Sequence, residues 1–169
     1  ISMTPNADNT IWTGTYTTGD NWLRDGVARG YVDTSYLADL VGNPGIGVVE
    51  NTFTIDRCKP PKPDLGTITG FPVDLEAALG RQTNIGAWNL EGTAKDNLRG
   101  AIENLENGIV RIRVGTATYD ANAYATGYFF RSIALTEGTQ EVGIRYIDRA
   151  GNVGDENAEN VIYDKTKPS

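Results

Sequence analysis

The sequence predicts an all-β protein of the sandwich type, and three observations lead to this prediction. Twenty glycines and seven prolines separate short runs rich in Val, Ile, Thr and Tyr, the composition of strands joined by turns. Residues 110–114 and 142–146 alternate apolar with other side chains, which is the period of a half-buried strand. One block of sequence also occurs twice, and a repeat defines both the unit and its boundaries.

The repeated block begins with the motif Asp-x-x-Gly-Asn-x-Gly. Residues 39–56 read DLVGNPGIGVVENTFTID, and residues 148–164 read DRAGNVGDENAENVIYD. The first glycine of the motif can adopt positive φ, while the Asp and Asn side chains can accept hydrogen bonds from N–H groups of a turn. Each copy continues into a β-branched or aromatic run that ends in Asp and is followed by lysine and proline. Because proline cannot donate to a sheet ladder, we expect an extended linker at Pro60 and again at Pro168.

These boundaries predict two units that divide near Cys58. Residues 1–57 form a partial unit, the C-terminal part of a repeat, and residues 58–169 form a complete sandwich of about 110 residues. We attribute the half unit, in decreasing order of preference, to cutting of a longer chain, to packing on its neighbour, or to completion by strands of another chain. The start of the sequence shows no signal-peptide pattern, which also favours a piece of a longer protein.

Within the complete unit, strands are expected at residues 65–70, 88–94, 110–114, 142–146 and 161–163. Two short helical insertions are expected as well. Leu98, Ala101, Ile102 and Leu105 follow helical spacing, and a second helical turn is expected from Asp74 as N-cap to a stop at Gly80.

Composition argues against several classes of function. The net charge of −7 and the isoelectric point near 4.6 disfavour nucleic acid as a partner, because that affinity depends on Lys and Arg. No apolar run approaches the roughly 20 residues of a membrane helix, so no membrane insertion is expected. The chain has no histidine, the commonest general base and a usual zinc ligand. Paired carboxylates remain as the one plausible catalytic chemistry, but carboxylates of an acidic sandwich are mostly solvated, and we expect no enzyme.

Calcium is the cofactor that the acidic residues suggest. Side-chain oxygens, which hard cations prefer, occur near both predicted domain ends, at Asp39, Asn43 and Asp56 and at their counterparts Asp148, Asn152 and Asp164. The alternative is that each Asp and Asn only caps a turn. The spacing matches no EF-hand loop, so both interpretations stay open.

Aromatic residues raise carbohydrate binding as another possibility. Trp12, Trp22 and Trp88 are the main candidates, and Tyr119, Tyr124 and Tyr128 are further ones, because flat rings can stack on sugar faces. The alternative is that these residues fill the core, as tryptophan commonly does in sandwiches.

The order of several segments resembles a known family. NLEGTAKDN, IVRIRVGTAT, ALTEGTQEVGIRYIDRAGNVG and VIYDKTKP follow one another, and together they resemble the bacterial immunoglobulin-like repeats found in tandem in large surface proteins and adhesins. The resemblance covers roughly residues 86–169, with a second partial copy over 11–61. Residues 71–85 and 95–106 are longer than the simple repeat, and these insertions are candidates for carrying specificity.

The resemblance implies an immunoglobulin-like β-sandwich outside a bacterial cell, on its surface or secreted. The implied function is a non-catalytic structural or adhesive module: a stalk, a spacer or a surface-assembly domain. Its partners would be neighbouring immunoglobulin-like repeats or identical chains, with a host molecule or a polysaccharide as ligand, and some such proteins stiffen their domain junctions with calcium. The alternative function is a carbohydrate-binding module attached to a secreted enzyme, which would present coplanar aromatics to solvent.

Overall fold

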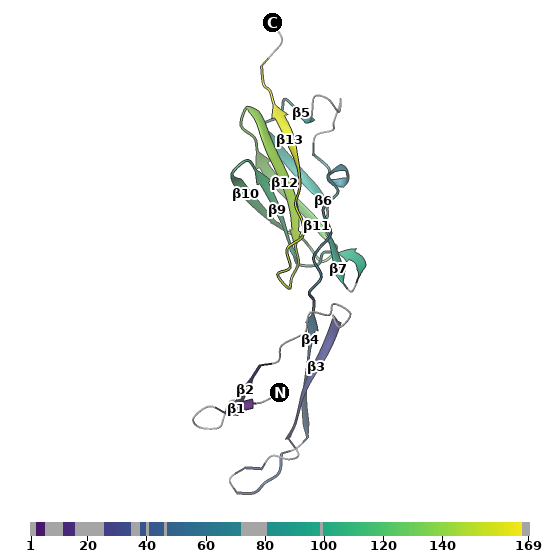
Figure 1. Cartoon of the computed structure of the whole chain (residues 1–169), viewed down its shortest axis with the longest axis vertical. Helices are drawn as coiled ribbons and strands as arrows, with labels where there is room; N and C mark the ends of the chain where they lie inside the picture. The colour runs from purple at the N-terminus through teal and green to yellow at the C-terminus, as the bar shows by residue number, and fades with distance from the viewer. Residues whose placement is uncertain are drawn as a thin grey trace.

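The computed structural model describes residues 3–5, 12–15, 26–34, 38–39, 41–45, 47–71, 81–98 and 100–166. The described part of the chain is built from strands, joined by turns and one 3-10 segment. The predicted all-β fold class is therefore confirmed. Figure 1 shows a sandwich at the C-terminal end and a long hairpin, β3–β4, that extends away from one end of it.

The larger sheet of the sandwich has five strands in the order β10-β9-β12-β13-β5, and the smaller one pairs β11 with β6. All these pairs are antiparallel except β13 with β5. An isolated bridge from Thr69 to Glu91 extends the smaller sheet. The strands are β5 (Arg81–Thr83), β6 (Ala87–Thr93), β9 (Ile109–Val114), β10 (Ala117–Asn122), β11 (Tyr128–Ala134), β12 (Gly138–Ile147) and β13 (Asn157–Tyr163).

Alternation of side chains builds the core between these sheets. In β9, burial alternates residue by residue, as the sequence predicts, because successive side chains of a strand point to opposite faces. The buried apolar side chains of the two sheets then meet in a single cluster. Its fully buried large members are Leu90, Leu105, Val110, Ile112, Phe129, Val142, Ile144 and Val161.

In the predicted first unit, the described residues form two separate two-stranded sheets. One pairs β1 (Met3–Pro5) with β2 (Trp12–Gly14), and the other pairs β3 (Gly26–Asp33) with β4 (Val48–Ile55). Tyr31 and Phe53 on the β3–β4 hairpin are 72% and 51% exposed. The hairpin corresponds in sequence to β12–β13 of the sandwich, but it has no further strand beside it among the described residues.

The predicted helix around residues 98–105 is wrong. These residues form the hairpin of β7 (Lys95–Leu98) and β8 (Ala101–Asn104). Gly100 adopts a φ of +82° at the turn, a conformation that glycine permits. Of the residues with helical spacing, Leu105 is buried whereas Ile102 is 59% exposed, so they do not share one apolar face.

Two further expectations concern the start of the sandwich. In place of the strand expected at 65–70, the chain forms the 3-10 segment η3 (Leu65–Thr67), where Asp64 accepts a hydrogen bond from the Gly66 N–H at 3.0 Å. Only Thr69 from this stretch bridges to a strand. The helical turn expected from Asp74 to Gly80 lies outside the described residues.

Candidate functional site

The two Asp-x-x-Gly-Asn motifs form the same turn. In the first, Asp39 accepts from the Asn43 N–H at 2.9 Å and from Asn43 Nδ2 at 2.8 Å. In the second, Asp148 accepts from the Asn152 N–H and from Asn152 Nδ2, both at 2.8 Å. The motif glycines, Gly42 and Gly151, have φ of +90° and +92°. The motif therefore encodes one backbone geometry at both positions.

The second turn also contacts the linker that joins the two units. Asn152 Nδ2 donates to the backbone carbonyl of Asp56 at 3.1 Å. Beside it, a Cβ built on Gly154 would lie 2.7 Å from the Pro60 carbonyl oxygen, so linker and turn are in close contact. Further along, Asn157 Nδ2 donates to the Pro63 carbonyl at 2.9 Å. The linker thus follows the sandwich surface, with Pro60 and Pro63 buried.

Three carboxylates meet at this junction. Each of Asp56, Asp96 and Asp148 offers an oxygen within 4.8 Å of the other two. They come from the end of β4, from β7 and from the turn after β12, so chain segments far apart in sequence build the cluster. Asp148 is buried at 5% exposure, and the other two are half-buried.

Access to the cluster comes from a groove between β4 and the end of the sandwich. Asp56 and Asp96 line this groove, with Phe53 on the β4 side and Arg149 on the turn. Figure 1 shows β4 and β7 approaching each other at this end of the sandwich. An ion from solvent could therefore reach the carboxylates.

The pKa of the Asp96 carboxyl is shifted by its position in this cluster. Burial raises the pKa of the Asp96 carboxyl, and the negative charges of Asp148 and Asp56 raise it further, although a hydrogen bond from the Asn97 N–H opposes the shift. Asn97 also has a buried side-chain oxygen with no hydrogen-bond partner among the described residues. Hard cations bind carboxylate oxygens, so Asp56, Asp96 and Asp148 could hold one. Asn97 follows Asp96 in β7, and successive side chains of a strand point to opposite faces, so its oxygen is not counted with the cluster.

The structure brings together only part of the predicted calcium set. Asp56, Asp148 and Asn152 meet at the junction, whereas Asp39 and Asn43 form an exposed turn of the first unit. Asp164 is exposed and accepts from the Thr166 N–H at 2.8 Å. These three residues have the turn-capping geometry that was the alternative interpretation.

The sequence analysis did not include Asp96 among the calcium ligands, because it expected a helical insertion in this part of the chain. The sequence feature that could have indicated Asp96 is its place in a polar Lys-Asp-Asn run.

Of the three tryptophans predicted as carbohydrate-binding candidates, the structure describes the side chain of Trp88 alone. Trp88 is buried at 5% exposure, with its ring centroid 6.3 Å from that of Phe71. A ring in the core cannot stack on a polysaccharide, so burial counts against Trp88 as a sugar-binding residue. Trp22 and the side chain of Trp12 lie outside the described part of the structure.

Comparison with known proteins gives no relative: neither a family model nor a curated protein matches the sequence. The resemblance to bacterial immunoglobulin-like repeats therefore stays a prediction.

In the part of the chain that the structure describes, no helix has the length and apolar character needed to cross a membrane.

Proposed function

We propose that this chain is a non-catalytic structural or adhesive module of an extracellular tandem array, in which a turn of each sandwich holds the tail of the preceding unit. The observation that carries the proposal is the hydrogen bond from Asn152 Nδ2 to the Asp56 carbonyl, formed while Asn152 also binds Asp148. One side chain thereby ties the motif of the second unit to the C-terminal end of the first.

Repetition of the motif supports an array. The first unit carries the same turn at Asp39–Asn43, and there the turn is exposed. The second unit ends in a strand and Asp164, the counterparts of β4 and Asp56. Each unit thus has an Asp-x-x-Gly-Asn turn and a C-terminal segment that ends in Asp. The turn of one unit can bind the C-terminal segment of the unit before it, so the same contact can repeat along a longer chain.

Calcium would stiffen this joint. Three carboxylates with oxygens within 4.8 Å of one another repel when all are charged, and a divalent cation would neutralise most of that charge. Because Asp56 belongs to the first unit and the other two belong to the second, a shared ion would restrict movement between the units.

Thermal unfolding in calcium and in chelator tests the cation. A ligand that binds only the native state at 100 times its Kd adds about 2.7 kcal/mol to the unfolding free energy, so the Tm should rise with calcium. Asp96→Asn should abolish this rise, whereas the control Asp39→Asn, in the exposed turn, should keep it. Superimposable curves for the wild-type chain with and without calcium would remove the cation from the proposal.

The reactivity of the Cys58 thiol can report on how firmly the linker is held against the turn at Asp148–Asn152. Cys58 is the single cysteine; it lies half-buried in the linker, and its N–H donates to Asp56 Oδ1 at 3.1 Å. Calcium should slow the modification of its thiol by a disulfide reagent, because holding Asp56 holds the linker. An unchanged rate in calcium, despite a raised Tm, would place the ion elsewhere in the molecule.

A further inference from the structure

The outer face of the β6–β11 pair carries exposed aromatic side chains. Tyr128 and Phe130 of β11 are 40% and 48% exposed, and Tyr124, in the segment just before β11, is 63% exposed. The rings of Tyr124 and Tyr128 are nearly parallel, with an interplanar angle of 20° and centroids 6.1 Å apart. Tyr128 lies opposite Thr93, and Phe130 lies opposite Glu91, so Tyr128 and Phe130 share one face of the sheet.

A polar group on the same face holds one of these rings, that of Tyr128, in place. The Tyr128 hydroxyl donates to Glu91 Oε2 at 2.7 Å, which fixes the ring before any ligand arrives. Next along the strands, Ser132 Oγ donates to Asn89 Oδ1 at 2.5 Å. The face contains no Leu, Ile, Val or Met: its residues are Ala87, Asn89, Glu91, Thr93, Tyr128, Phe130, Ser132 and Ala134.

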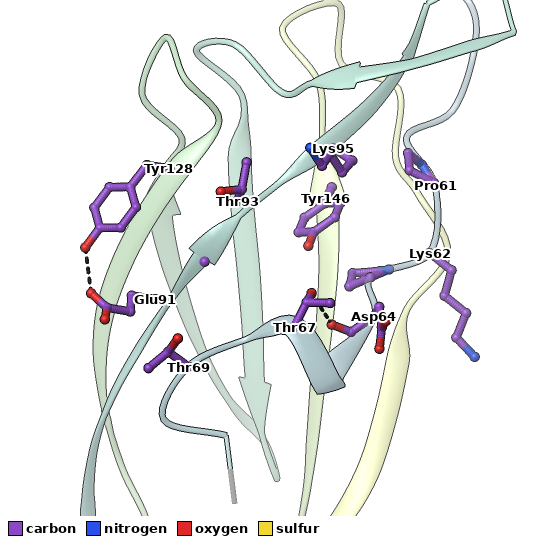
Figure 2. A pocket seen from close by; sticks show the side chains of 12 residues that line it. Pro61, Lys62, Asp64, Thr67, Thr69, Glu91, Thr93, Lys95, Tyr128 and Tyr146 are labelled. Atoms are coloured by element: carbon purple, nitrogen blue, oxygen red, sulfur yellow. Dashed lines mark hydrogen bonds between the residues drawn. The ribbon is translucent and has the colours of Figure 1, made fainter.

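A hollow adjoins this face, and five of the twelve residues that line it carry hydroxyl groups. Figure 2 shows Tyr128 and Glu91 on one side, Thr69 and Thr93 between, and the linker with η3 on the other side. The lining includes Lys62, Lys95, Asp64 and Glu91, so its formal charges balance. Lys95 is further engaged by Asn104 Oδ1, at 2.8 Å from its Nζ.

Tyr146 supplies a hydroxyl at the wall of the hollow, although the rest of its side chain is packed in the core. The residue is 3% exposed and lines the hollow, with its oxygen directed toward Thr67 (Figure 2). This hydroxyl makes no hydrogen bond to any described residue. Burial, helped by the charge of Asp64, raises the pKa of Tyr146 to about 12, so the group stays protonated and can donate at physiological pH. A donor that faces the hollow and makes no hydrogen bond to the protein is available to a ligand oxygen.

We propose that this face and hollow bind a neutral polysaccharide, whose sugar rings stack on Tyr124 and Tyr128 and whose hydroxyls exchange hydrogen bonds with Glu91, Thr93 and Tyr146. Flat amphipathic rings beside hydroxyl and carboxylate groups match the alternating apolar and polar surface of a sugar. Balanced charges give no preference for an anionic chain.

Affinity electrophoresis in native gels tests the site. The gels contain soluble barley β-glucan, laminarin, xylan or galactomannan, with polygalacturonate as the anionic comparison. At least one neutral polysaccharide should retard the chain. Tyr124→Ala and Tyr128→Ala should each weaken that binding about tenfold, the loss of one aromatic contact of about 1.4 kcal/mol. Tyr146→Phe keeps the ring and removes the donor, and it should weaken binding severalfold.

The matched control is Tyr31→Ala, which removes a still more exposed tyrosine, 72% accessible, from the β3–β4 hairpin and should leave retardation unchanged. Unfolding curves establish that every variant is folded. The proposal is overturned if no neutral polysaccharide retards the chain, if only polygalacturonate does, or if both tyrosine variants bind like the wild-type chain. Asp96→Asn should not alter retardation, so failure here and failure of the calcium joint are distinguishable.

Discussion

The turns at Asp39–Asn43 and Asp148–Asn152 share their hydrogen bonds, their positive-φ glycine and a bridge that closes each turn, Ala38 to Pro44 in one and Ile147 to Val153 in the other. They differ in what surrounds them. The first is exposed, whereas Asp148 is buried and its partner Asn152 reaches the linker. A short motif thus specifies a backbone shape, and its position beside a neighbouring unit decides whether that shape only turns the chain or also forms a joint.

The largest expected difference between the turns comes from removing their asparagine side chains. Asn152→Ala leaves the buried Asp148 carboxylate without one donor and the Asp56 carbonyl without its partner, a loss of about 2–3 kcal/mol. Asn43→Ala removes one hydrogen bond from a solvated turn and should cost about 0.5 kcal/mol or less. Urea unfolding followed by circular dichroism measures both losses. Equal losses would show that contact with the linker adds no stability.

Thiol labelling of Cys58 sharpens the same comparison at the joint. Asn152→Ala should speed the labelling, because the linker loses its hydrogen bond to the turn, whereas Asn43→Ala should leave the rate unchanged. Faster labelling in both variants would indicate general loosening of the chain and would contradict a joint built by the second turn alone.

A smaller effect is expected from the last glycine of each motif. A Cβ on Gly154 would meet the Pro60 carbonyl oxygen at 2.7 Å, whereas one on Gly45 would meet Thr34 of its own unit. Gly154→Ala should therefore displace the linker, at a cost of about 1–2 kcal/mol, and raise the Cys58 labelling rate. Gly45→Ala should strain the first unit without changing that rate. Unaltered labelling in Gly154→Ala would mean that the linker does not rest on this glycine in solution.

The sequence was sufficient to predict the elements whose signal is local. The alternation in β9 and β12 and both glycine turns could be predicted because each depends on neighbouring residues in the chain. The β7–β8 hairpin could not, since Leu98, Ala101, Ile102 and Leu105 have helical spacing and only the fold shows that Ile102 faces solvent. That error also concealed Asp96, whose role depends on Asp56 and Asp148 arriving from distant segments.

The aromatic face illustrates a similar limit. Tyr124 and Tyr128 were recognisable candidates in the sequence, but the tryptophans were the stronger ones, and burial removes Trp88 from the surface. Tyr146 looked like an ordinary core residue of an alternating strand. Its hydroxyl faces a hollow formed by the linker and η3, and no local pattern encodes where those segments pass.

The smallest expected effect is a difference in pH dependence between the two acidic sites. Hydrogen bonds from the Asn43 side chain and N–H lower the pKa of Asp39 below its ordinary value of 3.8, so its contribution to stability is present above that value and is lost as pH falls through the folded pKa. Burial and the charges of Asp148, Asp56 and Glu103 raise the pKa of Asp96 above 3.8. Its contribution has the opposite sign: it is present below 3.8 and is lost as pH rises through the raised value.

Melting curves of calcium-free protein between pH 3 and pH 7 separate these contributions. Asp96→Asn should raise the Tm most at the upper end of this range, where burial and the nearby carboxylates disfavour the charged form of Asp96, and should leave it nearly unchanged at the lower end. Asp39→Asn should lower the Tm slightly at the upper end and have no effect at the lower end. If Asp96→Asn instead lowered the Tm at pH 7 without calcium, the three carboxylates would already be neutralised by the protein itself, and the argument for a cation between the units would fail.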